Sequence, residues 1–71
     1  MTDTIKFKMA LVKNQMTMHD LADEIGLSTT SLSYKVNNKI EFRSSEIIAI
    51  QNVLKLSNVE RDEIFFAHNV D

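Results

Sequence analysis

A single glycine, Gly26, and the absence of proline are the features that most constrain the fold of this 71-residue chain. Glycine adopts a positive φ without steric cost, so Gly26 favours a sharp turn between two helices. Apolar residues recur at spacings of three and four on both sides of it, as in short helices that bury one face. We expect the buried positions to be Leu21, Ala22, Ile25, Leu32 and Val36. Residues 21–38 therefore predict two short amphipathic helices that meet at Gly26.

Apolar residues recur at helical spacing along the rest of the chain too, and no segment shows the alternation typical of a strand. Residues that commonly cap helices stand before three expected helices, at Thr17, Ser28 and Ser57. Ser57 and Glu60 match the S-x-x-E capping box, and Thr17 with Asp20 is an imperfect version of it. The sequence therefore predicts an all-α, compact five-helix bundle that forms one domain of all 71 residues. The expected helices span residues 4–14, 18–26, 29–37, 44–56 and 58–66.

Composition places the chain among soluble globular proteins of the cytoplasm. Hydrophobic residues make up 44% of the chain and charged residues 25%, which disfavours disordered and fibrous classes. The longest apolar runs, residues 9–12 and 47–50, are far shorter than the roughly 20 residues that span a bilayer, and the first residues lack the pattern of a signal peptide. Because the chain has no cysteine, we expect no disulfide and no thiolate metal site. We therefore expect a cytoplasmic protein that does not bind membranes.

Charge is distributed unevenly along the chain, whose formal net charge is −2. Residues 28–43 contain three basic residues against one acidic residue, whereas residues 57–71 contain four acidic residues against one basic residue. Domains that bind nucleic acid by neutralising phosphates are usually basic. The basic segment therefore suits a nucleic acid, and the acidic segment suits a basic protein surface.

The residues around the turn have the sizes that a tight crossing of two helices requires. Ala22 is small where the next helix approaches, Gly26 permits the turn, and Leu27 fills the corner. The segment LADEIGLSTTSLSYKVNN resembles the lambda-repressor and Cro type of helix-turn-helix found in phage and bacterial regulators. The residues that carry this resemblance are Leu21, Ala22, Gly26, Leu27, Ser28 and Leu32.

The resemblance covers almost the whole chain and implies a lambda-repressor-like bundle with the helix-turn-helix at the second and third helices. Within that family, the chain is similar to the small Cro-like proteins of temperate phages of Gram-positive bacteria. Among these, it resembles the modulator-of-repression antirepressors of lactococcal phages. The resemblance therefore implies a regulator of the switch between lysis and lysogeny.

In this family the third helix lies in the major groove of DNA, with base edges near its beginning and phosphates near its end. The implied DNA-binding residues are Ser28, Thr29, Thr30, Ser33, Tyr34, Asn37, Lys39 and Arg43. Two departures from the family pattern argue against recognition of DNA by this protein alone. Short hydroxyl side chains stand where discrimination of about 1–3 kcal/mol per base pair usually needs Arg, Asn or Gln. Met18 stands where many relatives have a glutamine that binds phosphate.

Alternatively, the hydroxyl residues are simply solvated, and Lys35, Lys39 and Arg43 form a solvated rim rather than phosphate ligands.

Aromatic residues near the end of the chain offer a second kind of site. Consecutive helical residues point about 100° apart, so at least one of Ile64, Phe65 and Phe66 is expected at the surface. In one interpretation two of them pack into the bundle and the third is half covered. In the other, an exposed phenylalanine with an acidic rim forms an anchor for a basic protein surface. Phe42 either joins that surface or fills the end of the bundle. The candidate partner-binding residues are Tyr34, Phe42, Asp62, Glu63, Phe65 and Phe66.

Two functions remain open. The protein is either an antirepressor that binds the phage repressor, with operator DNA contacted weakly or jointly with it, or an autonomous Cro-type repressor that binds operator DNA. Catalysis has little support because His19 and His68 are the only histidines and the single glycine argues against a phosphate-binding loop. We also expect a chain this short to lack a pocket of about 300 Å³. We therefore expect no enzyme activity, cofactor, metal or small-molecule substrate.

Overall fold

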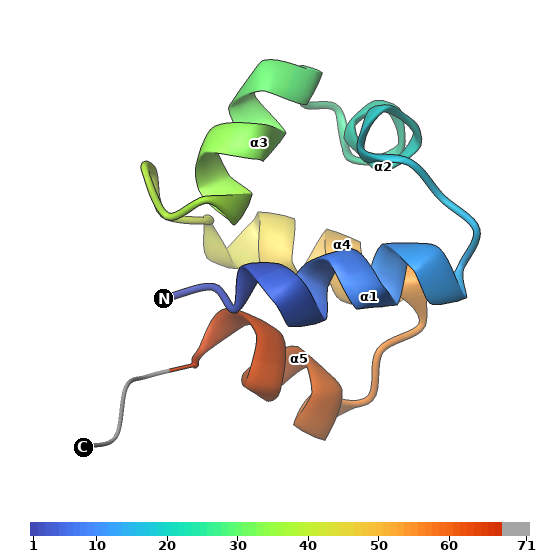
Figure 1. Ribbon diagram of the computed structural model, residues 1–71, viewed down its shortest axis with the longest axis vertical. Helices are drawn as coiled ribbons and strands as arrows, with labels where there is room; N and C mark the ends of the chain where they lie inside the picture. The colour runs from blue at the N-terminus through green and yellow to red at the C-terminus, as the bar shows by residue number, and fades with distance from the viewer. Residues whose placement is uncertain (68–71) are drawn as a thin grey trace.

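The computed structural model describes residues 1–67, which form five α-helices and no strand (Figure 1). The helices are α1 (Thr4–Lys13), α2 (Met18–Ile25), α3 (Thr29–Val36), α4 (Ser44–Leu54) and α5 (Asn58–Phe65). The all-α, five-helix prediction is confirmed, and every helix begins at the expected residue. The largest difference is the end of α4, which stops two residues early because Lys55 adopts a left-handed conformation with a φ of 56°.

The helices are arranged around α1 and α4, which occupy the middle of the molecule (Figure 1). α2 packs against α3 and α4 at one end, and α5 packs against α1 and α4 at the other. Burying a large apolar side chain contributes about 1.5–3 kcal/mol. The largest fully buried side chains are Phe7, Leu21, Leu32, Val36 and Ile50, and α5 adds Ile64 and Phe65. One core therefore joins all five helices.

Reciprocal caps fix the beginnings of α2 and α5. The hydroxyl of Thr17 accepts the Asp20 N–H at 3.1 Å, and the Asp20 carboxylate accepts the Thr17 N–H at 2.9 Å. Ser57 and Glu60 make the same pair of bonds at 3.1 and 2.9 Å. Hydrogen bonds from the Thr17 backbone and then its hydroxyl lower the pKa of Asp20, and those from Ser57 lower the pKa of Glu60. Both predicted capping boxes are confirmed.

Gly26 ends α2 in the left-handed conformation, with a φ of +76°. The N–H of Leu27 donates to the carbonyl oxygen of Ala22 at 2.9 Å and closes the end of the helix. A Cβ added at Gly26 would meet no atom within 4 Å. Glycine is therefore favoured here by backbone conformation, which costs other residues roughly 1–2 kcal/mol, and not by lack of space.

The first residues are clamped to the end of α3 by a contact that the sequence did not indicate. Asn38 has a φ of 63°, the left-handed conformation that asparagine tolerates better than most residues. Its side-chain oxygen accepts the Thr2 N–H at 2.7 Å, and its side-chain amide donates to the Thr2 carbonyl at 2.9 Å. The Asp3 N–H donates to the carbonyl oxygen of Ile64 at 2.7 Å. The N-terminal segment thus joins the ends of α3 and α5.

Candidate interaction surfaces

The residues that the resemblance assigns to DNA lie on α3, on its two caps, and in the loop that leads to Arg43, the N-cap of α4. Ser28 caps the helix by accepting the Ser31 N–H at 3.0 Å, and the buried Leu32 and Val36 hold one side of the helix against the core. Ser33 is half-buried, whereas the other assigned residues are exposed. These are Ser28, Thr29, Thr30, Tyr34, Asn37, Lys39 and Arg43. α3 lies at one end of the molecule (Figure 1), and DNA binding by it stays a prediction.

His19 connects α2 to the first residue of α3, a contact that sequence reasoning missed. Its Nδ1 lies 3.3 Å from the Thr29 hydroxyl, and its Nε2 lies 3.4 Å from the Asp23 carboxylate. A neutral imidazole has one N–H, so the Thr29 hydroxyl accepts from Nδ1 in one tautomer and donates to it in the other. All three side chains are exposed, so each contact contributes little stability. Together they orient the Thr29 hydroxyl toward α2.

Lys35 is buried, which corrects its assignment to a solvated rim or to phosphate binding. Its ammonium lies 2.8 and 2.6 Å from the two carboxylate oxygens of Glu46 on α4, and the two side chains are only 10% and 13% exposed. Glu46 also accepts the Arg43 N–H at 2.8 Å. Burial raises the pKa of Glu46, but the hydrogen bonds from Lys35 and the Arg43 backbone outweigh it, so the pKa lies below 4.5.

The ion pair changes the charge of the surface around α3. With Lys35 neutralised internally, residues 28–43 retain two exposed cations, Lys39 and Arg43, against Glu41. No ion pair of the described residues involves either cation. The surface is therefore less basic than the sequence indicated, because one of its three positive charges holds α3 to α4 instead.

Asn37 and Ser33 are hydrogen-bonded to each other on α3. The side-chain amide of Asn37 lies 2.9 Å from the Ser33 carbonyl oxygen and 3.4 Å from its hydroxyl. The donor that the resemblance assigns to phosphate is thus already used within the helix. A phosphate contact by this amide must compete with both bonds.

Phe42 and Phe65 form an aromatic cluster with Phe7 inside the molecule. The ring centroids lie 6.1 Å apart for Phe7 and Phe42, 5.9 Å for Phe7 and Phe65, and 5.2 Å for Phe42 and Phe65. Phe65 is only 4% exposed and Phe42 is half-buried, whereas Phe66 is 56% exposed. Phe65 is therefore a core residue in this structure, which corrects its assignment to a partner surface, because the phase of α5 turns it inward. Of the three phenylalanines assigned to a partner, only Phe66 has a large exposed surface.

The N-terminus, the loop after α3 and the end of α5 lie on the same side of the molecule (Figure 1), and exposed apolar side chains from these three segments line one hollow. Met1, Ile40 and Phe66 are exposed there and line a hollow of about 460 Å³, with Glu41 on its wall. We call these three residues the terminal patch. Sequence reasoning identified Phe66 but missed Met1 and Ile40, because they fall outside the helical stripes and are brought together only by the tertiary fold.

The remaining partner candidates lie outside the core. Tyr34 is exposed on α3, as expected. Asp62 pairs with Arg61 at 2.8 Å, and Glu63 pairs with Lys6 at 3.8 Å, with both carboxylates about half exposed. The acidic groups expected to form a rim are therefore at the surface, but each already faces a cation of the same chain.

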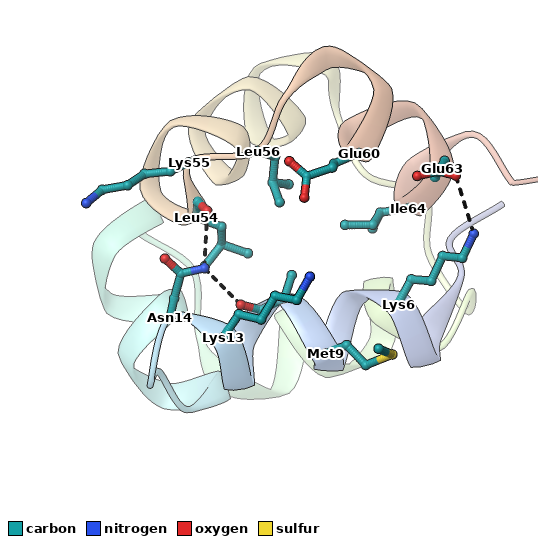
Figure 2. A pocket seen from close by; sticks show the side chains of 11 residues that line it. Lys6, Met9, Lys13, Asn14, Leu54, Lys55, Leu56, Glu60, Glu63 and Ile64 are labelled. Atoms are coloured by element: carbon teal, nitrogen blue, oxygen red, sulfur yellow. Dashed lines mark hydrogen bonds and ion pairs between the residues drawn. The ribbon is translucent and has the colours of Figure 1, made fainter.

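A groove separates α1 from α5 (Figure 2). Its volume is about 340 Å³, and Leu54, Leu56 and Ile64 are among its apolar lining residues. Asn14 closes one end by donating to the carbonyl oxygen of Leu54 at 3.1 Å (Figure 2). The expectation that so short a chain lacks space of about 300 Å³ was wrong. Open grooves between short helices provide that volume without interrupting the core.

No helix within residues 1–67 has the length and apolar composition needed to cross a membrane. No three His, Cys, Asp or Glu residues of that part of the chain come together as a metal-binding group. His68, one of the two histidines of the chain, lies outside the described residues.

Comparison with known proteins identifies a sequence family. No curated protein matches the chain. A family described as "Protein of unknown function (DUF739)" matches residues 3–68. The match begins at the N-cap of α1 and includes all five helices. Because it covers nearly the entire sequence, the chain belongs to the DUF739 family.

Proposed function

We propose that this protein is a phage transcriptional regulator of the lysis–lysogeny switch that acts as an antirepressor. It binds the phage repressor and relieves or modulates the repressor's DNA binding. In this proposal α2 and α3 form a helix-turn-helix of the lambda-repressor and Cro type, and the main partner is a protein. The proposal combines the resemblance of residues 21–38 with the distribution of apolar and charged groups on the surface.

The terminal patch is the observation that carries the proposal. Met1, Ile40 and Phe66 expose apolar surface around one hollow, and Glu41 lies on its wall. Asp62 lies one helical turn before Phe66. An aromatic anchor beside carboxylates suits a partner with an apolar pocket in a basic surface. The DNA-binding face of a repressor has that basic character because it must bind phosphates.

Features of the α3 surface favour a protein partner over independent binding to DNA. Lys35 forms an ion pair with Glu46, and the side-chain amide of Asn37 donates a hydrogen bond within the helix. The remaining exposed groups near the beginning of α3 are hydroxyls, which give less base discrimination than bidentate side chains. Binding to operator DNA in this proposal is therefore weak alone and stronger together with the repressor.

Changing Ile40 and Phe66 to Ser should weaken the proposed complex with the phage repressor. Loss of a central aromatic anchor costs about 2 kcal/mol or more, which corresponds to a roughly thirtyfold increase in Kd. Isothermal titration of purified repressor measures this change. Ile48→Ser is the matched control because Ile48 is as exposed as Phe66 but does not line the hollow. Equal affinities of wild type and the double variant would contradict the proposal.

The alternative function is autonomous binding of operator DNA, favoured by the exposed row of Thr29, Thr30 and Tyr34 on α3. Under this alternative, Thr30→Ala combined with Asn37→Ala should abolish a gel shift by the protein alone at about 0.1 M salt. The wild-type titration, run with and without repressor, separates the two functions. A change in the repressor's own shift when the protein is added, with no shift by the protein alone, supports the antirepressor. A tight sequence-specific shift by the protein alone supports the alternative.

A further inference from the structure

The outer face of α1 carries an exposed apolar strip. Ile5, Met9 and Val12 recur at the spacing i, i+4, i+7, and their exposed fractions are 72%, 55% and 75%. With Lys8 and Lys13 they line a shallow hollow of about 380 Å³. Helices of soluble proteins usually turn polar side chains outward on the face opposite the core. An apolar strip at this place therefore indicates a surface that is covered in an assembly.

Two rows of opposite charge lie beside the strip, across the groove between α1 and α5. Lys6 and Lys13 come from α1, and Glu63 and Glu60 come from α5 (Figure 2). The Lys6 ammonium is 3.8 Å from the Glu63 carboxylate. Bonds from the backbone and hydroxyl of Ser57 lower the pKa of Glu60, and the charge of Lys13 adds to this effect. The two rows run in register because α1 and α5 run in opposite directions (Figure 1).

We propose that this face binds a second copy of the chain about a two-fold axis that runs along the groove. Such a rotation exchanges the α1 side with the α5 side and keeps the order of residues along the groove. Lys13 then faces Glu60 of the partner subunit, and Lys6 faces Glu63 of the partner subunit. The apolar strip of each copy is covered at the same time.

Charge complementarity is what selects a second copy as the occupant. No carboxylate within residues 1–67 pairs with Lys8 or Lys13 within 4.0 Å, so α1 presents cations beside its apolar strip. α5 of the same fold presents carboxylates beside the exposed Val59. A surface with a cationic α1 side and an acidic α5 side can bind a second copy of itself when the two copies are related by a two-fold rotation. This symmetry also limits the assembly to two copies.

The size of the face predicts a weak dimer. α1 has 10 residues and α5 has 8, so their lengths are about 15 and 12 Å. Such a face buries less than a standard interface of about 1,600 Å², and small interfaces are typical of transient contacts. We therefore expect a Kd on the order of 10–100 µM. The interface contains none of the terminal patch residues, so its test is independent of the proposed function.

Sedimentation equilibrium of the full chain from about 1 µM to 1 mM measures this association across its expected range. The wild type should pass from monomer to dimer. Met9→Glu combined with Val12→Glu should remain monomeric, because the carboxylates enter the interface without a partner charge. Ile48→Glu, a substitution of an exposed apolar residue on α4, should dimerise like the wild type. Circular dichroism checks that every variant is folded.

Charge reversal tests the pairing itself. In the proposed homodimer, each contact joins residue 13 of one copy to residue 60 of the other. Lys13→Glu makes both of these residues glutamate, and Glu60→Lys makes both of them lysine. Each variant alone should dimerise at least about tenfold more weakly than the wild type, because like charges oppose across the interface. An equal mixture should recover the wild-type affinity, since both contacts of the mixed dimer join opposite charges.

Three outcomes overturn the proposal. A wild type that stays monomeric at about 1 mM leaves the strip to a partner of another kind. A dimer that persists in the Met9→Glu, Val12→Glu variant has its interface elsewhere. Folded charge-reversal variants that do not recover affinity on mixing show that the two rows do not meet.

Discussion

Replacing Lys35 with Met is expected to lower the free energy of unfolding by about 3 kcal/mol at pH 7, because it leaves the buried carboxylate of Glu46 without its cation. Both side chains lie largely out of water, so solvent cannot replace the lost partner. Urea denaturation followed by circular dichroism measures the difference. The loss should appear as a lower midpoint with an unchanged slope.

A second variant and a pH series separate the ion pair from simple packing. Adding Glu46→Gln to Lys35→Met should restore much of the stability, because glutamine can still accept the Arg43 N–H without a buried charge. Folding lowers the pKa of Glu46, so its stabilising contribution is present above pH 4.5 and is lost as the pH falls below that value. The gap between wild type and Lys35→Met should therefore shrink in acid. A constant gap would show that the charge is unimportant.

Phe65→Ala should cost about 3–5 kcal/mol of stability, whereas Phe66→Ala should cost less than about 1 kcal/mol. Phe65 is buried against Phe7 and Phe42, while more than half of Phe66 is exposed. A chain of this length has a total stability of roughly 4–10 kcal/mol, so the Phe65 variant should lose between about a third and all of it. Thermal unfolding of the two variants, recorded together, tests this contrast. Similar melting temperatures would contradict the burial of Phe65.

The contrast also decides how binding experiments are interpreted. Loss of repressor binding after a change at Phe65 reports loss of the fold. Loss of binding after a change at Phe66 or Ile40 reports loss of surface. The two neighbouring phenylalanines therefore serve as a control for each other in any test of a partner.

The features that could be predicted from sequence are those determined by residues close together in the chain. The Thr17–Asp20 and Ser57–Glu60 caps join residues three positions apart, and the structure contains both. Gly26 predicted a turn because glycine adopts the required φ without steric cost. The left-handed Lys55 was missed because lysine has no comparable preference for that conformation.

The remaining features depend on contacts between distant residues. Lys35 and Glu46 belong to different helices, and nothing in either segment shows that the lysine turns inward. Phe65 and Phe66 are neighbours in sequence, so they point about 100° apart around the axis of α5. The apolar periodicity of so short a helix does not determine which of the two faces the core. The terminal patch depends on the ends of three segments meeting in space.

Asn38 is a position at which few other residues could serve, because it meets two demands at once. Glycine would satisfy the left-handed backbone but would leave Thr2 without either hydrogen bond. Aspartate could accept from the Thr2 N–H but would turn a carboxylate toward the Thr2 carbonyl. Asparagine alone combines tolerance of that φ with a donor and an acceptor at the reach observed. Homologues that share the clamp should therefore keep this residue, while those that replace it should also differ at the start of the chain.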